Sequence, residues 1–160
     1  MTPLTTCLWF DGQAEEAARF YVSLFDGELG EISRFGKEGQ DIHGQPEGAV
    51  MTVNFRIRGQ SFVGLNGGPM FKFSEAVSFQ IFCDSQEEVD GFWQKLGADG
   101  GEPGACGWIK DRFGVSWQVI PNRFMELIKD NDRAKVGRTM DAMLKMGKLD
   151  IAALERAAAG

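Results

Sequence analysis

This sequence is poor in the residues that most often bind metals or form cross-links. Its 160 residues include one histidine, His43, and three cysteines, Cys7, Cys83 and Cys106, none of which form a CxxC pair. That spacing excludes a zinc ribbon and a thioredoxin-type redox pair, so we expect small core thiols in a reducing compartment. We expect His43 in an exposed loop, with a role as general base as the alternative.

Long hydrophobic runs are also missing. No apolar stretch approaches the roughly 20 residues that a membrane-spanning helix needs. Residues 1–4 have neither the charged stretch nor the apolar core of a signal peptide. We therefore expect a cytoplasmic protein that does not bind membranes. With 43% hydrophobic residues, the chain can build the core of one domain or of two half-domains.

Positive charge is scarce in the first three quarters of the chain. Residues 1–120 carry a net charge of −8 and residues 121–160 one of +2, which together give the −6 of the whole chain. An acidic body repels the phosphate backbone, so a nucleic-acid partner is not expected. The basic C-terminal part is expected to lie against the acidic body of its own chain or of a partner subunit.

What the sequence does contain is an internal repeat with an offset of 72 residues. The repeat matches Phe10, Glu15, Glu16, Ala17, Phe20, Tyr21 and Leu24 with Phe82, Glu87, Glu88, Val89, Phe92, Trp93 and Leu96. In each copy a short apolar strand precedes a helix whose apolar residues recur at the spacing of one buried face. The glutamate pairs fall in the first helical turns, where the helix dipole favours negative charge.

Strand signals follow each of these helices. Residues 51–57 alternate between apolar and polar side chains, and a turn leads to a second strand at residues 62–65. In the second half we predict strands at residues 106–110 and 115–120. Each half is therefore predicted to fold as βαβββ, with a mobile loop at residues 36–48.

Several residues predict where the helices begin and end. Ser85 and Glu88 have the spacing of a capping box at the start of the second helix. Gly27 and Gly97 are predicted to end the two helices in the left-handed conformation.

From Pro121 onward the pattern becomes helical. Pro121 suits a first helical position, a second helix is predicted at residues 133–146, and Asp150 is predicted to cap a last, alanine-rich helix. Met140 and Met143 lie on one face of the second helix. We expect this face to pack on the protein's own sheet, with a partner-binding surface as the alternative.

Three segments carry a family resemblance. They are residues 8–21, residues 64–69 and residues 107–118, and in this order they resemble the PhnB-like branch of the vicinal-oxygen-chelate (glyoxalase/bleomycin-resistance/dioxygenase) superfamily. The resemblance covers about residues 3–121. This branch often carries the label 3-demethylubiquinone-9 3-methyltransferase, but the glycine-rich segment 64–68 matches no nucleotide-binding motif and does not open a helix.

The resemblance implies an α+β fold. Residues 1–121 would form one glyoxalase-like domain of two tandem βαβββ modules, at about 3–70 and 74–121, that enclose a cavity. Residues 122–160 would be a C-terminal helical extension. In this superfamily such cavities are commonly completed by dimerisation, so the resemblance also implies a homodimer.

The metal-dependent enzymes of this superfamily take their ligands from the first and last strands of each module. The corresponding positions here are about Thr6, Asn66, Ser78 or Gln80, and Gln118. These side chains are neutral and cannot offset the dehydration of a divalent cation without added charge. We therefore expect neither a metal nor another cofactor.

The leading functional hypothesis is a metal-free protein that binds an unidentified small molecule. The expected ligand contacts are Thr6, Asn66, Ser78, Gln80, Cys106, Trp108 and Gln118. Trp108 would supply a flat apolar surface, and a nucleophilic role for Cys106 is the alternative to a binding one. The rival hypotheses are a lyase, isomerase or dioxygenase with an atypical metal site and a structural or interaction protein, so catalysis is left open.

Overall fold

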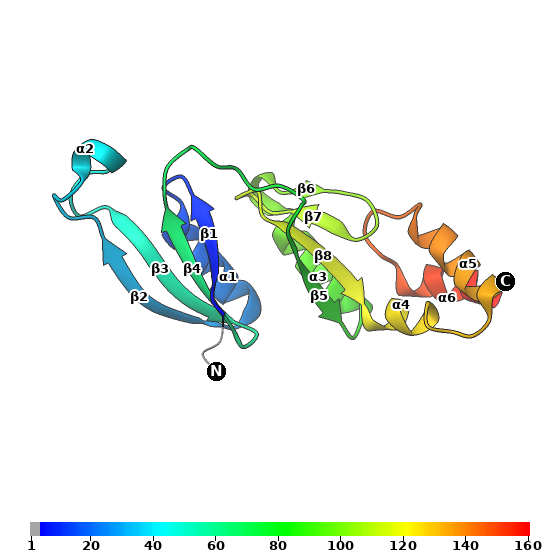
Figure 1. Cartoon of the computed structure of the whole chain (residues 1–160). Coiled ribbons are helices and arrows are strands. Elements are labelled where there is room, and N and C mark those ends of the chain that lie inside the picture. Colours follow the sequence, from blue (N-terminus) through cyan, green and yellow to red (C-terminus); the bar gives the residue numbers. More distant parts are fainter. Residues whose placement is uncertain (1–3) are drawn as a thin grey trace. The chain divides into compact units, whose positions relative to one another are not determined.

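The computed structural model describes residues 4–160, which form two compact units, residues 4–72 and residues 73–160 (Figure 1). Residue 3, where the first module was predicted to begin, lies outside the described residues. Each unit contains one four-stranded sheet. No helix of residues 4–160 is both long enough and apolar enough to cross a bilayer.

The first unit follows the predicted βαβββ order. Its elements are β1 (Thr6–Phe10), α1 (Ala14–Phe25), β2 (Glu28–Arg34), α2 (Gln40–His43), β3 (Val50–Ile57) and β4 (Gln60–Asn66). The strand order is β1-β4-β3-β2, with β1 parallel to β4 and the other pairs antiparallel. The short helix α2 lies within the segment that was predicted to be a loop.

The second unit repeats this topology. Its elements are β5 (Ser78–Cys83), α3 (Gln86–Leu96), a short 3-10 helix η1 (Ala98–Gly100), β6 (Glu102–Pro103), β7 (Trp108–Lys110) and β8 (Ser116–Pro121). The strand order is β5-β8-β7-β6, again with the first strand parallel to the last. The predicted α+β fold of two βαβββ modules is thus confirmed.

The alignment of the two repeats needs one correction. Three residues connect β1 to α1, whereas two connect β5 to α3. Phe10 therefore corresponds to Cys83, since each ends its strand and is buried, and not to Phe82, which is 48% exposed. A shift of one residue moves every side chain of a strand to the other face of the sheet.

The two helix ends also differ from the prediction. After α1 the left-handed residue is Asp26 (φ 51°), and Gly27 is needed for another reason. A Cβ at Gly27 would overlap the carbonyl oxygen of Arg56. After α3, Gly97 is right-handed (φ −80°), and Asp99 has the positive φ of 54°.

One face of each sheet packs against its own helix. In the first unit α1 covers the face of β3 that carries Val53 and Phe55, and the Phe55 ring stacks on Phe62 with 5.1 Å between centroids. In the second unit α3 covers buried residues that include Ile109 and Val119. We call the opposite face of each sheet its open face.

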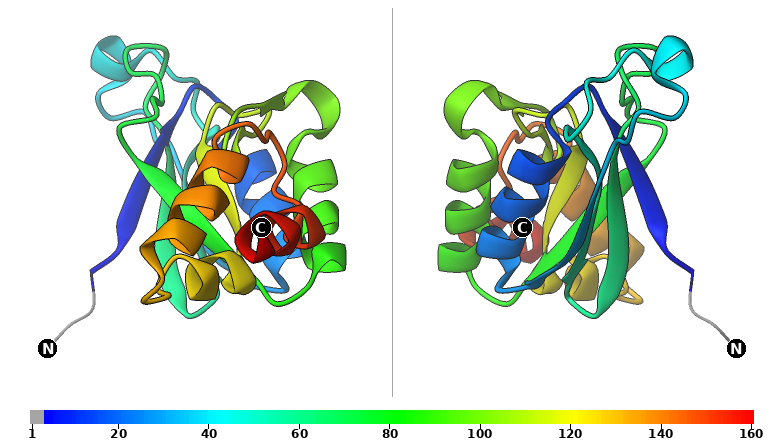
Figure 2. Two further views of the ribbon diagram at one scale, coloured as in Figure 1. Left: turned by 90° about the vertical axis from the view of Figure 1, so that its right-hand side faces the viewer. Right: turned by 90° about the vertical axis from the view of Figure 1, so that its left-hand side faces the viewer.

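The C-terminal helices α4 (Asn122–Leu127), α5 (Arg133–Met143) and α6 (Ile151–Ala159) belong to the second unit and lie together in Figure 2. Pro121 precedes α4 as its N-cap and is not its first helical residue. The predicted cap at Asp150 is confirmed, because its carboxylate accepts a hydrogen bond from the Ala153 N–H at 2.8 Å.

These helices share a core with the end of β8. Its buried members are Ile120, Phe124, Leu127, Leu149, Leu154 and Ala158. Met140 and Met143 pack against this cluster, which the C-terminal helices form with Ile120 of β8, so the methionine-rich face packs on its own chain but mainly on helices and not on the sheet as predicted. Leu144, the residue that follows the end of α5, is 61% exposed.

Candidate functional site

Four of the predicted ligand contacts meet on the open face of the second sheet. Gln80 of β5 lies directly opposite Gln118 of β8, and Gln118 lies opposite Trp108 of β7. Ser78 is two residues before Gln80 and therefore projects from the same face. The sheet register thus brings Ser78, Gln80, Trp108 and Gln118 together.

Hydrogen bonds connect three of these side chains. Gln118 Nε2 donates to Ser78 Oγ at 2.8 Å, and Gln80 Nε2 donates to Gln118 Oε1 over a longer 3.4 Å. Gln80 is exposed, whereas Ser78 and Gln118 are half-buried. These bonds hold the amide of Gln118 in place. The exposed side of these three residues, where Gln80 lies, stays open to a ligand.

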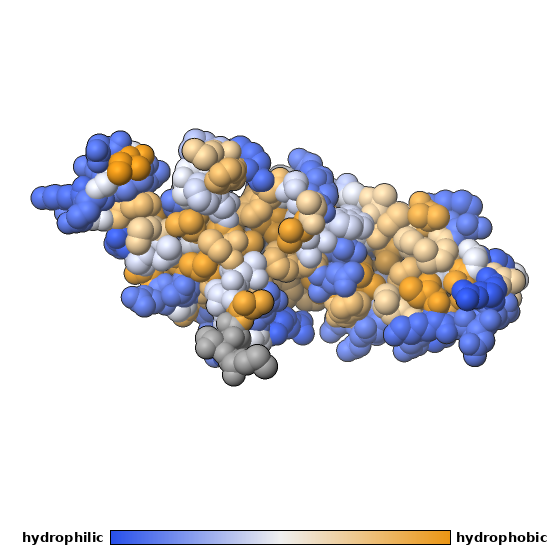
Figure 3. All heavy atoms as spheres, viewed as in Figure 1, coloured by the Kyte–Doolittle hydropathy of each residue, from blue (hydrophilic) through white to orange (hydrophobic). Residues whose placement is uncertain are grey.

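A pocket of about 170 Å³ lies beside Trp108 in the same unit. Its polar and aromatic lining includes Glu75, Glu102, Trp108, Lys110 and Ser116, together with the backbone of Gly104. On the side of the molecule drawn in Figure 3, hydrophobic residues lie among hydrophilic ones over the strands of this unit. The open face therefore offers both polar and apolar contacts.

Charge at this pocket was missed by the sequence analysis, which expected uncharged ligand contacts. Lys110 Nζ and Glu75 Oε1 form an ion pair at 2.5 Å. The hydrogen bond between them raises the pKa of Lys110 and lowers the pKa of Glu75. Alternation along β7 places Lys110 on the same face as Trp108, so the sequence held a signal for Lys110. No pattern in the sequence around Glu75 indicated that it would line this pocket.

Thr6 and Asn66 lie in the first unit, on the side of the sheet that α1 covers. The buried Asn66 accepts a hydrogen bond from the Ala14 N–H at 2.9 Å and donates one to the Val50 carbonyl at 3.0 Å. Thr6 Oγ1 accepts a hydrogen bond from Gln60 at 3.0 Å. Asn66 thus joins the start of α1 to β3, and a ligand role for Thr6 and Asn66 stays a prediction.

Only one of the three cysteines is buried. Cys83 lies in the core, Cys7 is exposed and Cys106 is half-buried. Partial burial raises the pKa of the Cys7 thiol, which lowers its thiolate fraction at neutral pH. Cys106 lies in a turn (φ 57°) before β7, which begins at Trp108 and not at residue 106 as predicted.

His43, predicted in an exposed loop, is the half-buried last residue of the short helix α2 and is held by nearby residues. Its Nδ1 accepts a hydrogen bond from the Gln45 N–H at 3.0 Å, and its Nε2 lies 3.2 Å from the Glu38 carbonyl oxygen. The ring also contacts Phe35, with 4.6 Å between centroids. These contacts give His43 a structural role in closing the loop around α2.

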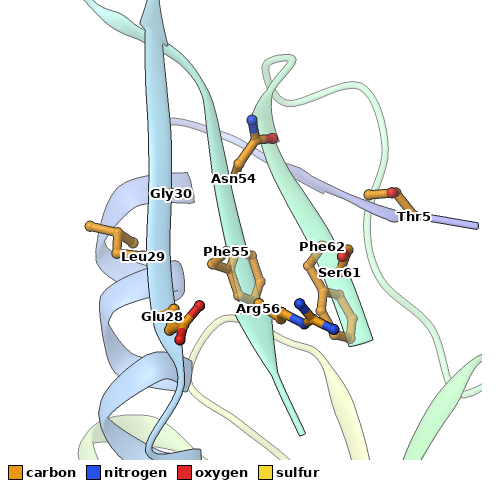
Figure 4. Close-up of a pocket in the computed structure, with 9 residues that line it drawn as sticks. All are labelled: Thr5, Glu28, Leu29, Gly30, Asn54, Phe55, Arg56, Ser61 and Phe62. Atoms are coloured by element: carbon orange, nitrogen blue, oxygen red, sulfur yellow. The ribbon is translucent and has the colours of Figure 1, made fainter. Parts of the chain in front are cut away.

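The first unit has a pocket of its own, of about 360 Å³ (Figure 4). It lies where β2 and β3 change register between Leu29 and Ile32, and Asn54 lines it from β3. In Figure 4, Arg56 extends from β3 toward Ser61 on β4. The register change interrupts the regular pairing of β2 with β3 beside this pocket.

The positions that correspond to metal ligands in the superfamily do not fit a divalent metal. Their hydroxyl and amide groups carry no charge, whereas the sites of catalytic divalent metals in proteins usually include histidine, thiolate or carboxylate ligands. Within residues 4–160, no three His, Cys, Asp or Glu side chains gather in a way that could hold a metal ion.

Comparisons with solved structures identify similar proteins. The PhnB protein from Bacillus cereus shares 35% sequence identity, covers 75% of this chain and 99% of its own, and gives a TM-score of 0.65. Protein PA1353 from Pseudomonas aeruginosa shares 20% identity over 76% of this chain and 98% of its own, with a TM-score of 0.60.

A fosfomycin resistance protein, FosX from Mesorhizobium loti, shares the fold at 14% identity. It covers 74% of this chain and 90% of its own, with a TM-score of 0.52. No protein among the curated proteins compared matches the chain.

The family model described as 3-demethylubiquinone-9 3-methyltransferase matches residues 2–120. The match ends where the C-terminal helices begin, and the PhnB protein from Bacillus cereus likewise covers three quarters of this chain. Together with the two βαβββ modules, these matches show that the chain belongs to the PhnB-like family of the vicinal-oxygen-chelate superfamily.

Proposed function

We propose that this protein binds a small organic molecule without a metal ion, on the open face of its second sheet. The observation that carries the proposal is the alignment of Ser78, Gln80, Gln118 and Trp108 on that face. Cys106 is two residues from Trp108, in the turn that leads into β7, and is the nearest of the other predicted contacts in sequence.

The chemistry of these groups suits recognition. Amides and hydroxyls donate and accept hydrogen bonds in fixed directions, while an indole ring provides a flat apolar surface. Small-molecule sites commonly combine a few such polar groups with apolar walls. None of the four side chains is a strong acid, base or nucleophile at neutral pH, which favours binding over catalysis.

The assembly and location are further parts of this proposal. We propose a homodimer, because superfamily cavities are commonly completed by a second copy, and a cytoplasmic protein with neither nucleic-acid nor membrane partners. Sedimentation at several protein concentrations tests the dimer directly.

The binding test is a thermal-shift screen of small aromatic compounds that carry amide or hydroxyl groups. We expect some of them to raise the Tm of the wild-type protein but not of Gln118→Leu. The matched control is Gln60→Leu, which removes an amide bonded to the Thr6 hydroxyl at 3.0 Å in the first unit. Equal increases in Tm for Gln118→Leu and Gln60→Leu would count against this site.

Metal analysis separates the proposal from its main rival. Protein purified without a histidine tag is expected to hold less than stoichiometric zinc, nickel, iron and manganese. A tightly retained, stoichiometric metal would overturn the proposal and favour a metal-dependent lyase, isomerase or dioxygenase.

A further inference from the structure

We propose that the pocket beside Trp108 takes a small organic cation, with the Ser116 hydroxyl as its hydrogen-bond partner. This inference rests on the proposed function and specifies the chemical class of the ligand. It follows from three features of the pocket, namely a buried hydroxyl, an excess of carboxylates and an aromatic wall.

The first feature is the hydroxyl of Ser116. Ser116 is 2% exposed, and its Oγ atom has no hydrogen-bond partner within the described part of the chain. It lies opposite both Ser78 of β5 and Lys110 of β7 and lines the pocket. A buried hydroxyl without a hydrogen-bond partner is unfavourable. Binding of a ligand whose N–H donates a hydrogen bond to this hydroxyl would therefore be favoured.

The second feature is the balance of charge. Glu75 and Glu102 line the pocket together with one cation, Lys110, so its formal charge is −1. Lys110 is already paired with Glu75 at 2.5 Å, and Glu102 lies opposite Lys110 in the sheet register. A cationic ligand would therefore balance the one carboxylate that the pocket has in excess.

An anion would meet the reverse situation. To reach Lys110 it would have to displace Glu75 and remain close to Glu102, against the net charge of −6 on the whole chain. Like charges held this close cost free energy that a neutral or cationic ligand avoids.

The third feature is Trp108, whose half-buried indole lines the pocket. The face of an indole ring attracts ammonium and guanidinium groups more strongly than other aromatic side chains do. The volume of about 170 Å³ limits the ligand to a small molecule, such as a small arylalkyl amine.

A matched set of probes tests the inference by isothermal titration calorimetry. Benzylamine, benzyl alcohol and benzoate share one ring and differ in charge at neutral pH. We expect benzylamine to bind about tenfold more tightly than benzyl alcohol, with benzoate weakest, and the difference to shrink in high salt. Benzoate binding as tightly as benzylamine would overturn the inference.

Variants assign the effect to the pocket. Glu102→Gln is expected to remove most of the preference for benzylamine over benzyl alcohol, and Ser116→Ala to weaken benzylamine binding by about tenfold. The matched control is Glu87→Gln, which removes one carboxylate from the first turn of α3. An unchanged preference in Glu102→Gln would also overturn the inference.

The outcomes distinguish this inference from the proposed function. If the three probes do not bind but thermal-shift hits still depend on Gln118, the cation inference fails and the proposed function stands. If neither the probes nor any compound of the screen binds, both fail.

Discussion

The Oε1 atom of Gln86 accepts a hydrogen bond from the Ile151 N–H at 2.8 Å, across 65 positions of sequence. The Nε2 atom of the same amide donates to the Leu149 carbonyl at 3.1 Å. One side chain at the start of α3 thus holds the backbone on both sides of Asp150, the cap of α6.

The turn before β7 makes a second attachment to the same segment. The N–H groups of Cys106 and Gly107 donate to the carbonyls of Met146 and Gly147 at 2.7 and 2.8 Å. Residues beyond the family match are therefore joined to the second module by backbone hydrogen bonds as well as by a hydrophobic core.

The attachment through Gln86 predicts a loss of stability in Gln86→Leu. The two backbone groups would lose their amide partner in a partly buried place, so we expect a cost of about 1–3 kcal/mol in the free energy of unfolding. Urea unfolding measures it. The control is Gln94→Leu, an exposed position on the same helix, which should cost far less. Equal costs would assign no special role to Gln86.

Asp111 predicts a larger effect. This buried carboxylate accepts hydrogen bonds from the N–H groups of Phe113 and Val115 at 2.9 and 3.1 Å, and from Trp117 Nε1 at 2.8 Å. Asp111→Ala would leave these donors without that acceptor, so we expect a cost of about 3 kcal/mol or more. Urea unfolding measures this cost, with the exposed Asp141→Ala as control.

The pair of Glu75 and Lys110 predicts a dependence on pH. The pKa of Glu75 lies below its usual 4.5, so its stabilisation is present above that value and is lost as the pH falls through the folded pKa. The pKa of Lys110 lies above its usual 10.5. The contribution of Lys110 to stability is therefore complete below 10.5 and is lost as the pH rises through the folded pKa. The pair is thus fully formed between these limits.

An NMR titration of the Glu75 carboxylate measures this coupling. In Lys110→Met its pKa should return toward the usual value, because the hydrogen bond and the nearby positive charge are gone. Lys95→Met removes a lysine from the end of α3 and should leave the titration of Glu75 unchanged. A titration unaffected by Lys110→Met would show that the ion pair does not form in solution.

Local patterns in the sequence were sufficient for much of the fold. The alternation at residues 51–57 predicted β3, and the hydroxyl of Ser85 accepts the Glu88 N–H at 3.2 Å as a cap should. Such features depend on neighbours a few residues away, so each can be read from one short segment. These local signals gave the first strand, the helix and the last two strands of each half, whereas no residues were singled out for β2 and β6.

Which side chains of a strand face the helix could not be predicted from the strand's own sequence. Thr6 and Ser78 are 72 positions apart, which is the offset of the repeat, but the one-residue difference between the two strand–helix connections places them on opposite faces of their sheets. Periodicity gives the alternation of a strand, while the length of the connection and the pairing partner decide which set faces the helix.

By itself, the sequence determined the two modules, their helices and the polar residues of β5 and β8. Only the tertiary structure decided that Glu75 pairs with Lys110, that Asn66 is occupied by the backbone of α1 and β3, and that Gln86 holds the C-terminal segment. The physical reason is range. Periodicity and capping are properties of adjacent residues, whereas these contacts form only when strands and loops far apart in sequence are brought together.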